Sequence, residues 1–231
     1  MKIRFCFLAT IAIAFSACNV KTPAEIPLGT WKYKLFMNGV EMGTALTVCE
    51  LKDGMYISSE ELDITIGDTR NVSTQILTET IDFKPVSIAI NNKVITSGGT
   101  QEINTSAVFN GKLATITAGG KSEVMVIDKP FVLAGNFFFK RLAEQEFRKG
   151  SKAEANIYDP SFETEDTIRV QMAAEGSELV TVNGKPRRLL HIRQIIEDYK
   201  DIDIYIDGIG IMRKAKILML NNKIELEIIE D

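Results

Sequence analysis

The densest set of side chains that could do chemistry is an acidic run near the C-terminus. Between Asp201 and Asp207 the sequence reads Asp-Ile-Asp-Ile-Tyr-Ile-Asp. In a β-strand this alternation places the carboxylates and the tyrosine on one face and the isoleucines on the other. Successive carboxylates would lie about 6.5–7 Å apart, too far to share one proton without a neighbouring strand. The run also lacks the glycine and the later glutamate of a calcium loop. We therefore interpret it as a solvated strand face, with calcium binding as the alternative.

His191 is the only histidine of the chain, and it stands between two apolar residues. A catalytic histidine needs a nucleophile or a substrate proton within hydrogen-bond reach. The sequence has no Gly-x-Ser-x-Gly elbow and no phosphate-binding loop, and Gly208-Ile209-Gly210 is too short for a dinucleotide fingerprint. We therefore expect a structural histidine and no enzymatic activity, and we keep a hydrolase as a minor alternative.

The three cysteines predict neither a disulfide framework nor a zinc site. Cys6 falls in the N-terminal apolar stretch, Cys18 follows it, and Cys49 lies in the strand-like run Ala45–Leu51. One thiol cannot form an intramolecular disulfide, and no Cys/His cluster is present. We expect Cys49 to be an inert core residue and the protein to hold no metal or cofactor.

The N-terminus has the pattern of a secretory signal. Lys2 and Arg4 precede an apolar stretch of about ten residues, which is shorter than the roughly 20 residues that span a bilayer. The stretch ends in Phe15-Ser16-Ala17-Cys18, which resembles the lipobox of bacterial lipoproteins. That resemblance implies cleavage before Cys18 and acylation of its thiol. The alternative is an ordinary signal peptide followed by an incidental cysteine.

The predicted division is a signal peptide at 1–17, a lipidated tether at 18–28 and a single β-rich domain at 29–231. Cleavage removes Lys2 and Arg4 from the 27 basic side chains. The mature chain then has 25 basic and 31 acidic side chains, which gives a net side-chain charge of −6. An acidic chain lacks the electrostatic footprint of a nucleic-acid-binding protein. Asn19 differs from the aspartate that marks retention in the inner membrane of some enteric bacteria. We therefore expect a lipid-anchored protein of the cell envelope, more often at the outer than the inner membrane, with its domain in the periplasm or at the cell surface.

The mature chain is a succession of short β-like runs separated by turn residues. The spacing of the turns, about every 8 to 12 residues, favours an antiparallel sheet folded as a sandwich or barrel. Hairpin turns are predicted at five doublets: Asn38-Gly39, Asn91-Asn92, Asn110-Gly111, Asn183-Gly184 and Asn221-Asn222. Strands are expected at 30–37, 44–51, 55–66, 70–80, 86–90, 93–96, 101–109, 112–118, 121–127, 153–158, 167–174, 178–182, 187–196, 201–207, 210–220 and 223–229.

One segment has helical spacing, and it contains the largest concentration of aromatic residues in the chain. We predict an amphipathic helix at about 136–148, with Asn136 as its N-cap and Gly150 closing its C-terminus. The aromatic and apolar side chains of this region would pack the helix on the sheet, or the helix would be a lid over an apolar groove. The candidate ligand-binding residues are Phe131, Phe138, Phe139, Leu142 and Phe147.

Three stretches resemble a group of periplasmic β-proteins of unknown function. They are the opening Gly29–Tyr33, then Glu178–Lys185 after the helical segment, and Ile204–Lys214. The group is related to the β-domains that accompany transglutaminase-like proteases and, more distantly, to the half-barrel carriers of lipoproteins and lipids. The resemblance implies a curved antiparallel sheet, a half-barrel or sandwich, with one helix packed on it. It implies no catalytic residues.

Together these patterns predict a lipid-anchored binding module that is mainly β and takes an apolar or amphipathic, lipid-like ligand. The alternative is a structural or interaction protein of the envelope that acts through strand edges or through the charged face around Asp201. The expected partners are the membrane, through the lipid on Cys18, and a lipid-like ligand or an envelope protein.

Overall fold

The computed structural model describes residues 20–160, 166–197, 200–219 and 222–230. Cys18 and the predicted signal peptide lie outside the described residues. Within these residues, fourteen strands form one long antiparallel sheet, and a single short helix lies between β8 and β9. No helix in the described part of the chain is long and apolar enough to span a bilayer.

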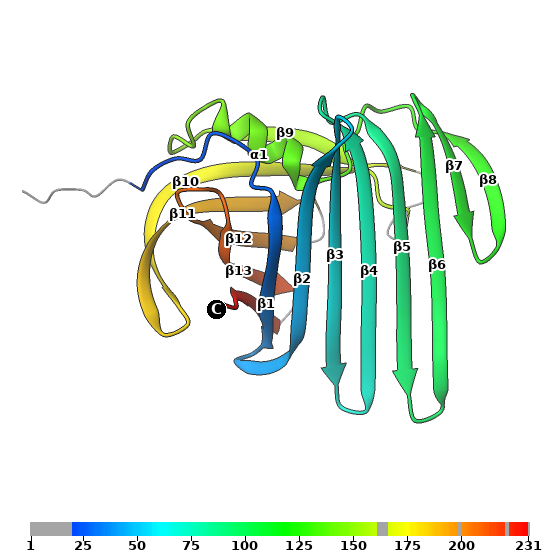
Figure 1. Ribbon diagram of the computed structural model, residues 1–231, viewed down its shortest axis with the longest axis horizontal. Coiled ribbons are helices and arrows are strands. Elements are labelled where there is room, and N and C mark those ends of the chain that lie inside the picture. Colours follow the sequence, from blue (N-terminus) through cyan, green and yellow to red (C-terminus); the bar gives the residue numbers. More distant parts are fainter. Residues whose placement is uncertain (1–19, 161–165, 198–199, 220–221, 231) are drawn as a thin grey trace, which may run out of the picture.

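The chain enters the sheet in its middle and builds it in two wings (Figure 1). The first wing is a meander of β1 (Gly29–Met37), β2 (Val40–Lys52), β3 (Met55–Ile66), β4 (Thr69–Thr80), β5 (Pro85–Thr96), β6 (Gly99–Asn110), β7 (Leu113–Ala118) and β8 (Lys121–Val126). The second wing comprises β9 (Lys152–Ile157), β10 (Ile168–Val182), β11 (Lys185–Ile196), β12 (Lys200–Ile206), β13 (Met212–Met219) and β14 (Asn222–Ile228).

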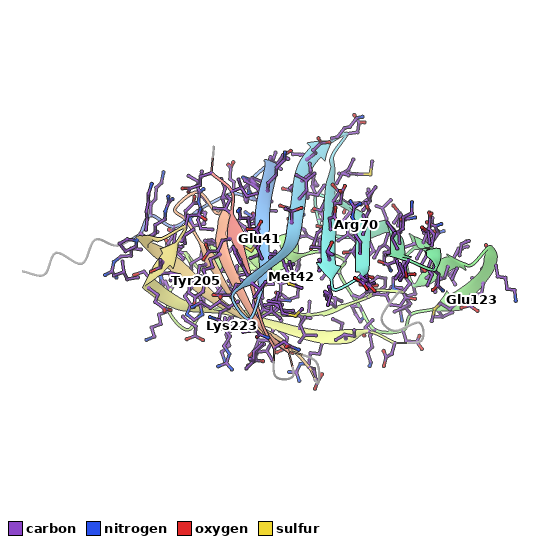
Figure 2. The ribbon with its side chains drawn as sticks, turned by 90° about the horizontal axis from the view of Figure 1, so that it is seen from below. Glu41, Met42, Arg70, Glu123, Tyr205 and Lys223 are labelled. Carbon is purple, nitrogen blue, oxygen red and sulfur yellow. The ribbon has the colours of Figure 1, made fainter. Side chains whose placement is uncertain are left out.

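The two wings join where β1 pairs with β14, in a register that includes Tyr33 opposite Ile228. The turn after β1 lies beside the turn between β13 and β14, since the Asn38 backbone N–H donates to the Lys223 carbonyl at 2.8 Å. Figure 2 shows Glu41, Met42 and Lys223 at this junction and Glu123 at the far end of the first wing. The sheet therefore stays open, with β8 and β9 as its two edges.

The turn chemistry explains most of the meander. Asn38 and Gly39 both have positive φ, 51° and 84°, and Asn183 and Gly184 have 50° and 74°. A two-residue turn of this kind matches the right-handed twist of the flanking strands, and only Gly, Asn and Asp adopt it at low cost. These two predicted hairpin turns are confirmed.

The predicted turn at Asn91-Asn92 is wrong, because both residues lie inside the continuous strand β5. The Asn91 amide donates to Glu102 Oε1 and Asn104 Oδ1, and the Ser73 hydroxyl donates to Asn92 Oδ1. Side-chain bonds across adjacent strands give these asparagines partners that a turn would otherwise supply. The two strands predicted at 167–174 and 178–182 are likewise one strand, β10, which bends at a bulge near Gly176.

The helix is shorter than predicted. Helix α1 (Gly135–Ala143) ends three residues before Glu146, where Glu146 and Phe147 adopt positive φ and turn the chain back toward the core. Asn136 lies inside the first turn of the helix instead of capping it, and the cap position is Ala134, without a side-chain hydrogen bond. Gly150 donates its N–H to the carbonyl of Ala174 on β10, so it joins the second wing and does not close the helix.

Helix α1 lies on the inner face of the second wing. Phe138 and Leu142, both almost fully buried, pack with Val170 and Ala174 of β10 and with Ile206 of β12. The connection on either side of α1 covers the far strands of the first wing. There Leu133 and Tyr158 complete a separate apolar cluster with residues of β5, β6 and β7. The predicted architecture, an antiparallel curved sheet with one helix packed on it, is confirmed, and the sheet is open.

Candidate functional site

An apolar cavity of about 350 Å³ lies between the two wings beneath helix α1. The first wing lines it with Trp31, Tyr33, Thr47, Cys49 and Leu77. The second wing contributes Met172, Ile192, Ile204, Ile206 and Met212, and the helix contributes Asn136, Phe139 and Leu142. Ile26 and Pro27, from the segment predicted to be a tether, also border it. The volume is within the roughly 300–1,000 Å³ of small-molecule pockets, which are mainly apolar with a few polar groups.

Polar side chains meet at one corner of the cavity, where Cys49, Ser58 and Asn136 line it and Glu79 is buried outside its lining. Asn136 of the helix donates from Nδ2 to Ser58 Oγ on β3 and to Glu79 Oε1 on β4, both at 3.1 Å. Ser58 Oγ lies 3.9 Å from Cys49 Sγ on β2, and Cys49 Sγ lies 4.0 Å from Asn136 Oδ1. We call these four residues, Cys49, Ser58, Glu79 and Asn136, the polar corner.

Glu79 is the most unusual member of the polar corner. Its side chain is only 1% exposed, and Oε2 has no hydrogen-bond partner in the part of the chain that the structure describes. Strand alternation places it on the same face of β4 as Gln75 and Leu77, which line the cavity. Burial raises the pKa of Glu79 to about 7, against a smaller lowering by the Asn136 hydrogen bond. The corner therefore holds a carboxyl group that takes up a proton near neutral pH.

The Cys49 thiol is buried next to this carboxyl group. Burial raises the pKa of Cys49, while the hydrogen bonds with Ser58 and Asn136 oppose the shift. A thiol whose pKa is raised is a poor nucleophile, because the thiolate is the reactive form. This placement agrees with the interpretation of Cys49 as an unreactive residue.

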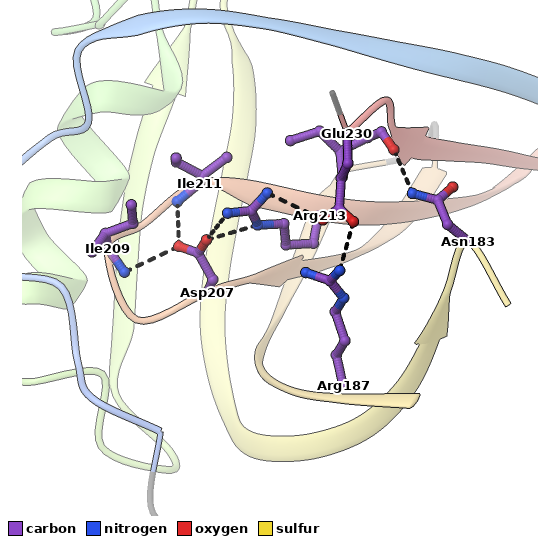
Figure 3. Close-up of polar contacts among 8 residues, drawn as sticks. Asn183, Arg187, Asp207, Ile209, Ile211, Arg213 and Glu230 are labelled. Carbon is purple, nitrogen blue, oxygen red and sulfur yellow. Dashed lines mark hydrogen bonds and ion pairs between the residues drawn. The ribbon is translucent and has the colours of Figure 1, made fainter. Parts of the chain in front are cut away.

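The turn between β12 and β13 borders the cavity, and Figure 3 shows the polar contacts that hold this turn. Asp207 Oδ1 accepts the backbone N–H groups of Ile209 and Ile211, both at 3.0 Å, and Asp207 Oδ2 accepts Arg213 Nε at 2.7 Å. Arg213 and Arg187 both contact Glu230 near the C-terminus. This network fixes the turn whose Gly210 and Ile211 line the cavity.

The structure divides the predicted ligand-binding residues into three groups. Phe139 and Leu142 line the cavity. Phe138 and Phe147 are buried in the core between the helix and the second wing. Phe131 packs edge-on against Phe109, in the apolar cluster of the first wing.

Sequence reasoning missed Glu79 and Asn136 as site residues. Glu79 follows Gln75 and Leu77 at even spacing on a predicted strand, so alternation could have placed it on the inner face. The sequence does not indicate which face of the strand the helix covers. Glu79 is unusual because it is buried, and its burial could not be predicted without that information.

His191 and the acidic run form a separate, charged hollow on the second wing. His191 Nε2 lies 2.7 Å from Asp203 Oδ1, and its Nδ1 lies 3.3 Å from Glu178 Oε2. Asp201 binds Arg193, while Asp207 binds Arg213 in the turn described above. No group of three or more possible metal-ligating side chains occurs within the described ranges. Each predicted carboxylate thus has its own basic partner.

These features define an open, β-barrel-like sheet with one apolar cavity beneath its helix. No family model matches the chain, and no curated protein sequence matches it. Among solved structures, it is similar to a β-barrel-like protein of the domain of unknown function DUF1849 from Brucella abortus. The TM-score is 0.61 at 11% identity, and the match covers 87% of this chain and 95% of the other. A DUF1089 family protein from Pseudomonas aeruginosa matches with a TM-score of 0.39 at 11% identity, over 91% of this chain and 95% of the other. The first likeness shows a shared fold.

Proposed function

We propose that this chain is a lipid-anchored protein of the cell envelope that binds an apolar or amphipathic ligand without acting on it chemically. The observation that carries the proposal is the cavity of about 350 Å³ between the wings, which side chains such as Leu142, Met172 and Ile204 make mainly apolar. An apolar ligand gains free energy there by leaving water, at roughly 25 cal/mol for each Å² buried.

The N-terminal segment supports a location next to a membrane. Val20 packs against the core cluster that contains Phe138 and Leu142 of the helix, and Ile26 borders the cavity. Two residues of extended chain span at most about 7 Å. A lipid carried by Cys18 would therefore keep helix α1 and the cavity close to the bilayer, from which an apolar ligand could enter. Val20 packs on the core cluster, Pro23 is buried and Ile26 borders the cavity, so residues 20–28 would act as a short attachment and not as a long spacer.

The proposal excludes catalysis for reasons of placement and chemistry. The Cys49 thiol, at the cavity, has a raised pKa, and its side-chain hydrogen bonds within the described residues go to Ser58 and Asn136, neither of which is a base that would activate it. His191 lies in the separate charged hollow, where two carboxylates hold its ring nitrogens.

The test is to identify what the protein carries after purification from a bacterial envelope fraction, by solvent extraction and mass spectrometry. Leu77→Trp would enlarge a side chain that lines the cavity, whereas Ile76→Trp places the same group on the opposite, exposed face of β4. We expect a stoichiometric lipid in the wild type and in Ile76→Trp, and much less in Leu77→Trp. Absence of lipid from all three, repeated after incubation with envelope lipids, would favour the alternative of an interaction protein.

A further inference from the structure

We propose that residues 20–28, which we call the strap, are the movable wall of the cavity, and that the ligand enters between the strap and the turn that joins β12 to β13. The inference rests on the proposed binding function and adds to it the route by which the ligand reaches the cavity. It starts from two observations. The strap borders the cavity with Ile26 and Pro27, and it is attached to the protein differently from the strands and the helix that form the other walls.

The strap lies directly against the turn between β12 and β13. A Cβ atom added to Gly208 would lie 3.1 Å from the carbonyl oxygen of Lys21 and 3.3 Å from its Cβ. A Cβ atom added to Gly210 would lie 3.3 Å from the Cβ of Pro23, which is buried. Gly210 also lines the cavity, as the second half of the strap does. Because Lys21 is exposed, this contact between strap and turn, which we call the seam, separates the cavity from solvent.

Backbone hydrogen bonds hold the other walls of the cavity but not the strap. The lining residues of β1 to β4 and of β10 to β13 belong to one continuous hydrogen-bonded sheet, and the turn is closed by a bond from the Gly210 N–H to the Asp207 carbonyl. In the described part of the chain, no backbone hydrogen bond joins residues 20–28 to another segment. Pro23 and Pro27 have no N–H group to donate. A segment without such bonds opens at a lower free energy than paired strands, so the strap is the wall that opens most easily.

Packing of a few apolar side chains keeps the strap closed. Val20 packs against the core cluster that contains Phe138 of the helix, and Figure 1 shows the segment before β1, in blue, passing α1. Pro23 is buried, whereas Ala24 and Glu25 are exposed. The strap therefore rests on the protein through one side only. A lipid anchor on the chain just before Val20 would place the seam next to the bilayer, which is the source of an apolar ligand.

A disulfide across the seam tests whether the strap must move. The Cβ atoms of positions 21 and 208 would be 3.3 Å apart, close to the roughly 3.5–4.5 Å of a disulfide, so a small shift of the strap closes the bond. The φ of Gly208 lies outside the left-handed range, so a cysteine is accommodated there. Lys21→Cys and Gly208→Cys would be introduced into a full chain whose Cys6, Cys18 and Cys49 are replaced by serine. The introduced pair is then the only one that can be oxidised.

The only tryptophan of the chain provides the measurement, because Trp31 lines the cavity. A bromine atom on the acyl chain of a ligand quenches a tryptophan that it contacts. Rapid mixing with a monoacylglycerol that carries bromine on its acyl chain gives the association and dissociation rate constants of the oxidised and the reduced protein. We expect oxidation to lower both rate constants at least about tenfold and to change Kd by less than about threefold, because a closed gate delays passage in both directions. Reduction should restore both rate constants.

Pro23→Ala tests the strap from the opposite direction and needs no disulfide. The variant loses part of the buried ring beside Gly210, so the seam should open more often. Both rate constants should then rise about threefold to tenfold, as expected for the loss of one or two buried methylene groups. Ala24→Ser changes an exposed position of the strap, and this matched control should behave as the wild type.

Each outcome separates the route from the binding function. If the brominated lipid does not quench Trp31 in the reduced protein, the binding function is overturned and the route with it. If the lipid binds at the same rate before and after oxidation, binding stands and the strap is not the route. If oxidation accelerates dissociation alone, the strap is a fixed wall and the inference is overturned. Since one protein is compared in its oxidised and reduced forms, a partial loss of folding in the variant cannot imitate the expected result.

Discussion

Gly210, in the turn between β12 and β13, lies directly against the ring of Phe139 on helix α1. A methyl group at Gly210 would lie 2.7 Å from Phe139 Cζ and 2.9 Å from Cε2, closer than side chains approach in folded proteins. The φ of Gly210 is +89°, a conformation that residues with a Cβ adopt only at a cost. The contact joins the turn held by Asp207 to the helix that covers the cavity.

We predict that Gly210→Ala destabilises the protein by about 2–4 kcal/mol, since backbone strain and overpacking against Phe139 act together. Gly150→Ala is the matched control, because Gly150 has the same φ of +89° and no atom within 4 Å of the added methyl group. Urea unfolding of both variants gives the two free energies, and their difference isolates the contact with Phe139. Equal destabilisation would show that Phe139 yields without cost.

The stability of the protein should fall as the pH rises from 5 to 8. The folded-state pKa of Glu79 is about 7, raised from 4.5 by burial, so the folded protein holds a proton that the unfolded chain releases. This stabilisation is complete below the unfolded pKa and is lost as the pH rises through about 7, an effect of up to roughly 3 kcal/mol.

Glu79→Gln should remove this pH dependence, and Glu61→Gln should not. The measurement is the free energy of unfolding in urea at pH 5 and at pH 8 for the wild type and both variants. A dependence of the same size in Glu79→Gln would assign it to another group.

The Cys49 thiol should react slowly with alkylating reagents in the native protein. Burial leaves 8% of the residue exposed and raises the pKa of the thiol, so little thiolate is present near neutral pH. We expect alkylation by iodoacetamide to be at least about tenfold slower than in urea, and slower still with a ligand in the cavity. Mass spectrometry of the peptide that contains Cys49 follows the reaction, with Cys49→Ser as the control. A native rate equal to the unfolded rate would contradict the described burial.

Replacement of Cys18 should release the protein from the membrane. Two or three acyl chains, at roughly 0.8 kcal/mol for each buried methylene group, anchor a protein stably, and Cys18→Ala removes their attachment point. Labelled palmitate should enter the wild type and not the variant, and the variant should leave the membrane fraction. Labelling that persists in Cys18→Ala would show that the lipobox resemblance is misleading.

The alternation of residues and the turn doublets were sufficient to predict the class of fold. Met55–Ile66 was predicted with the observed bounds, because alternating residues lie between two turns that contain glycine. The Asn91-Asn92 doublet misled the prediction, because asparagine also bonds across strands, and only the positions of Glu102, Asn104 and Ser73 show which use applies.

The site was predictable only in part, for a reason of topology. Phe139 and Leu142 were found from helical spacing, but their facing partners come from strands far away in the sequence. Whether a glutamate such as Glu79 is solvated or buried depends on which strand face the helix covers. That choice follows from the crossover between β8 and β9, which local patterns do not determine.

The most direct test of the account is to locate the ligand by photo-crosslinking. An amphiphile with a diazirine on its acyl chain would be bound to the full chain and irradiated, and the crosslinks would be mapped by peptide mass spectrometry. We predict labelling of cavity residues on three elements: Leu142 on α1, Met172 on β10 and Ile204 on β12. Leu77→Trp should reduce this labelling and Ile76→Trp should not. Labelling confined to exposed residues such as Val108 and Val124, unchanged in both variants, would contradict a ligand-binding cavity.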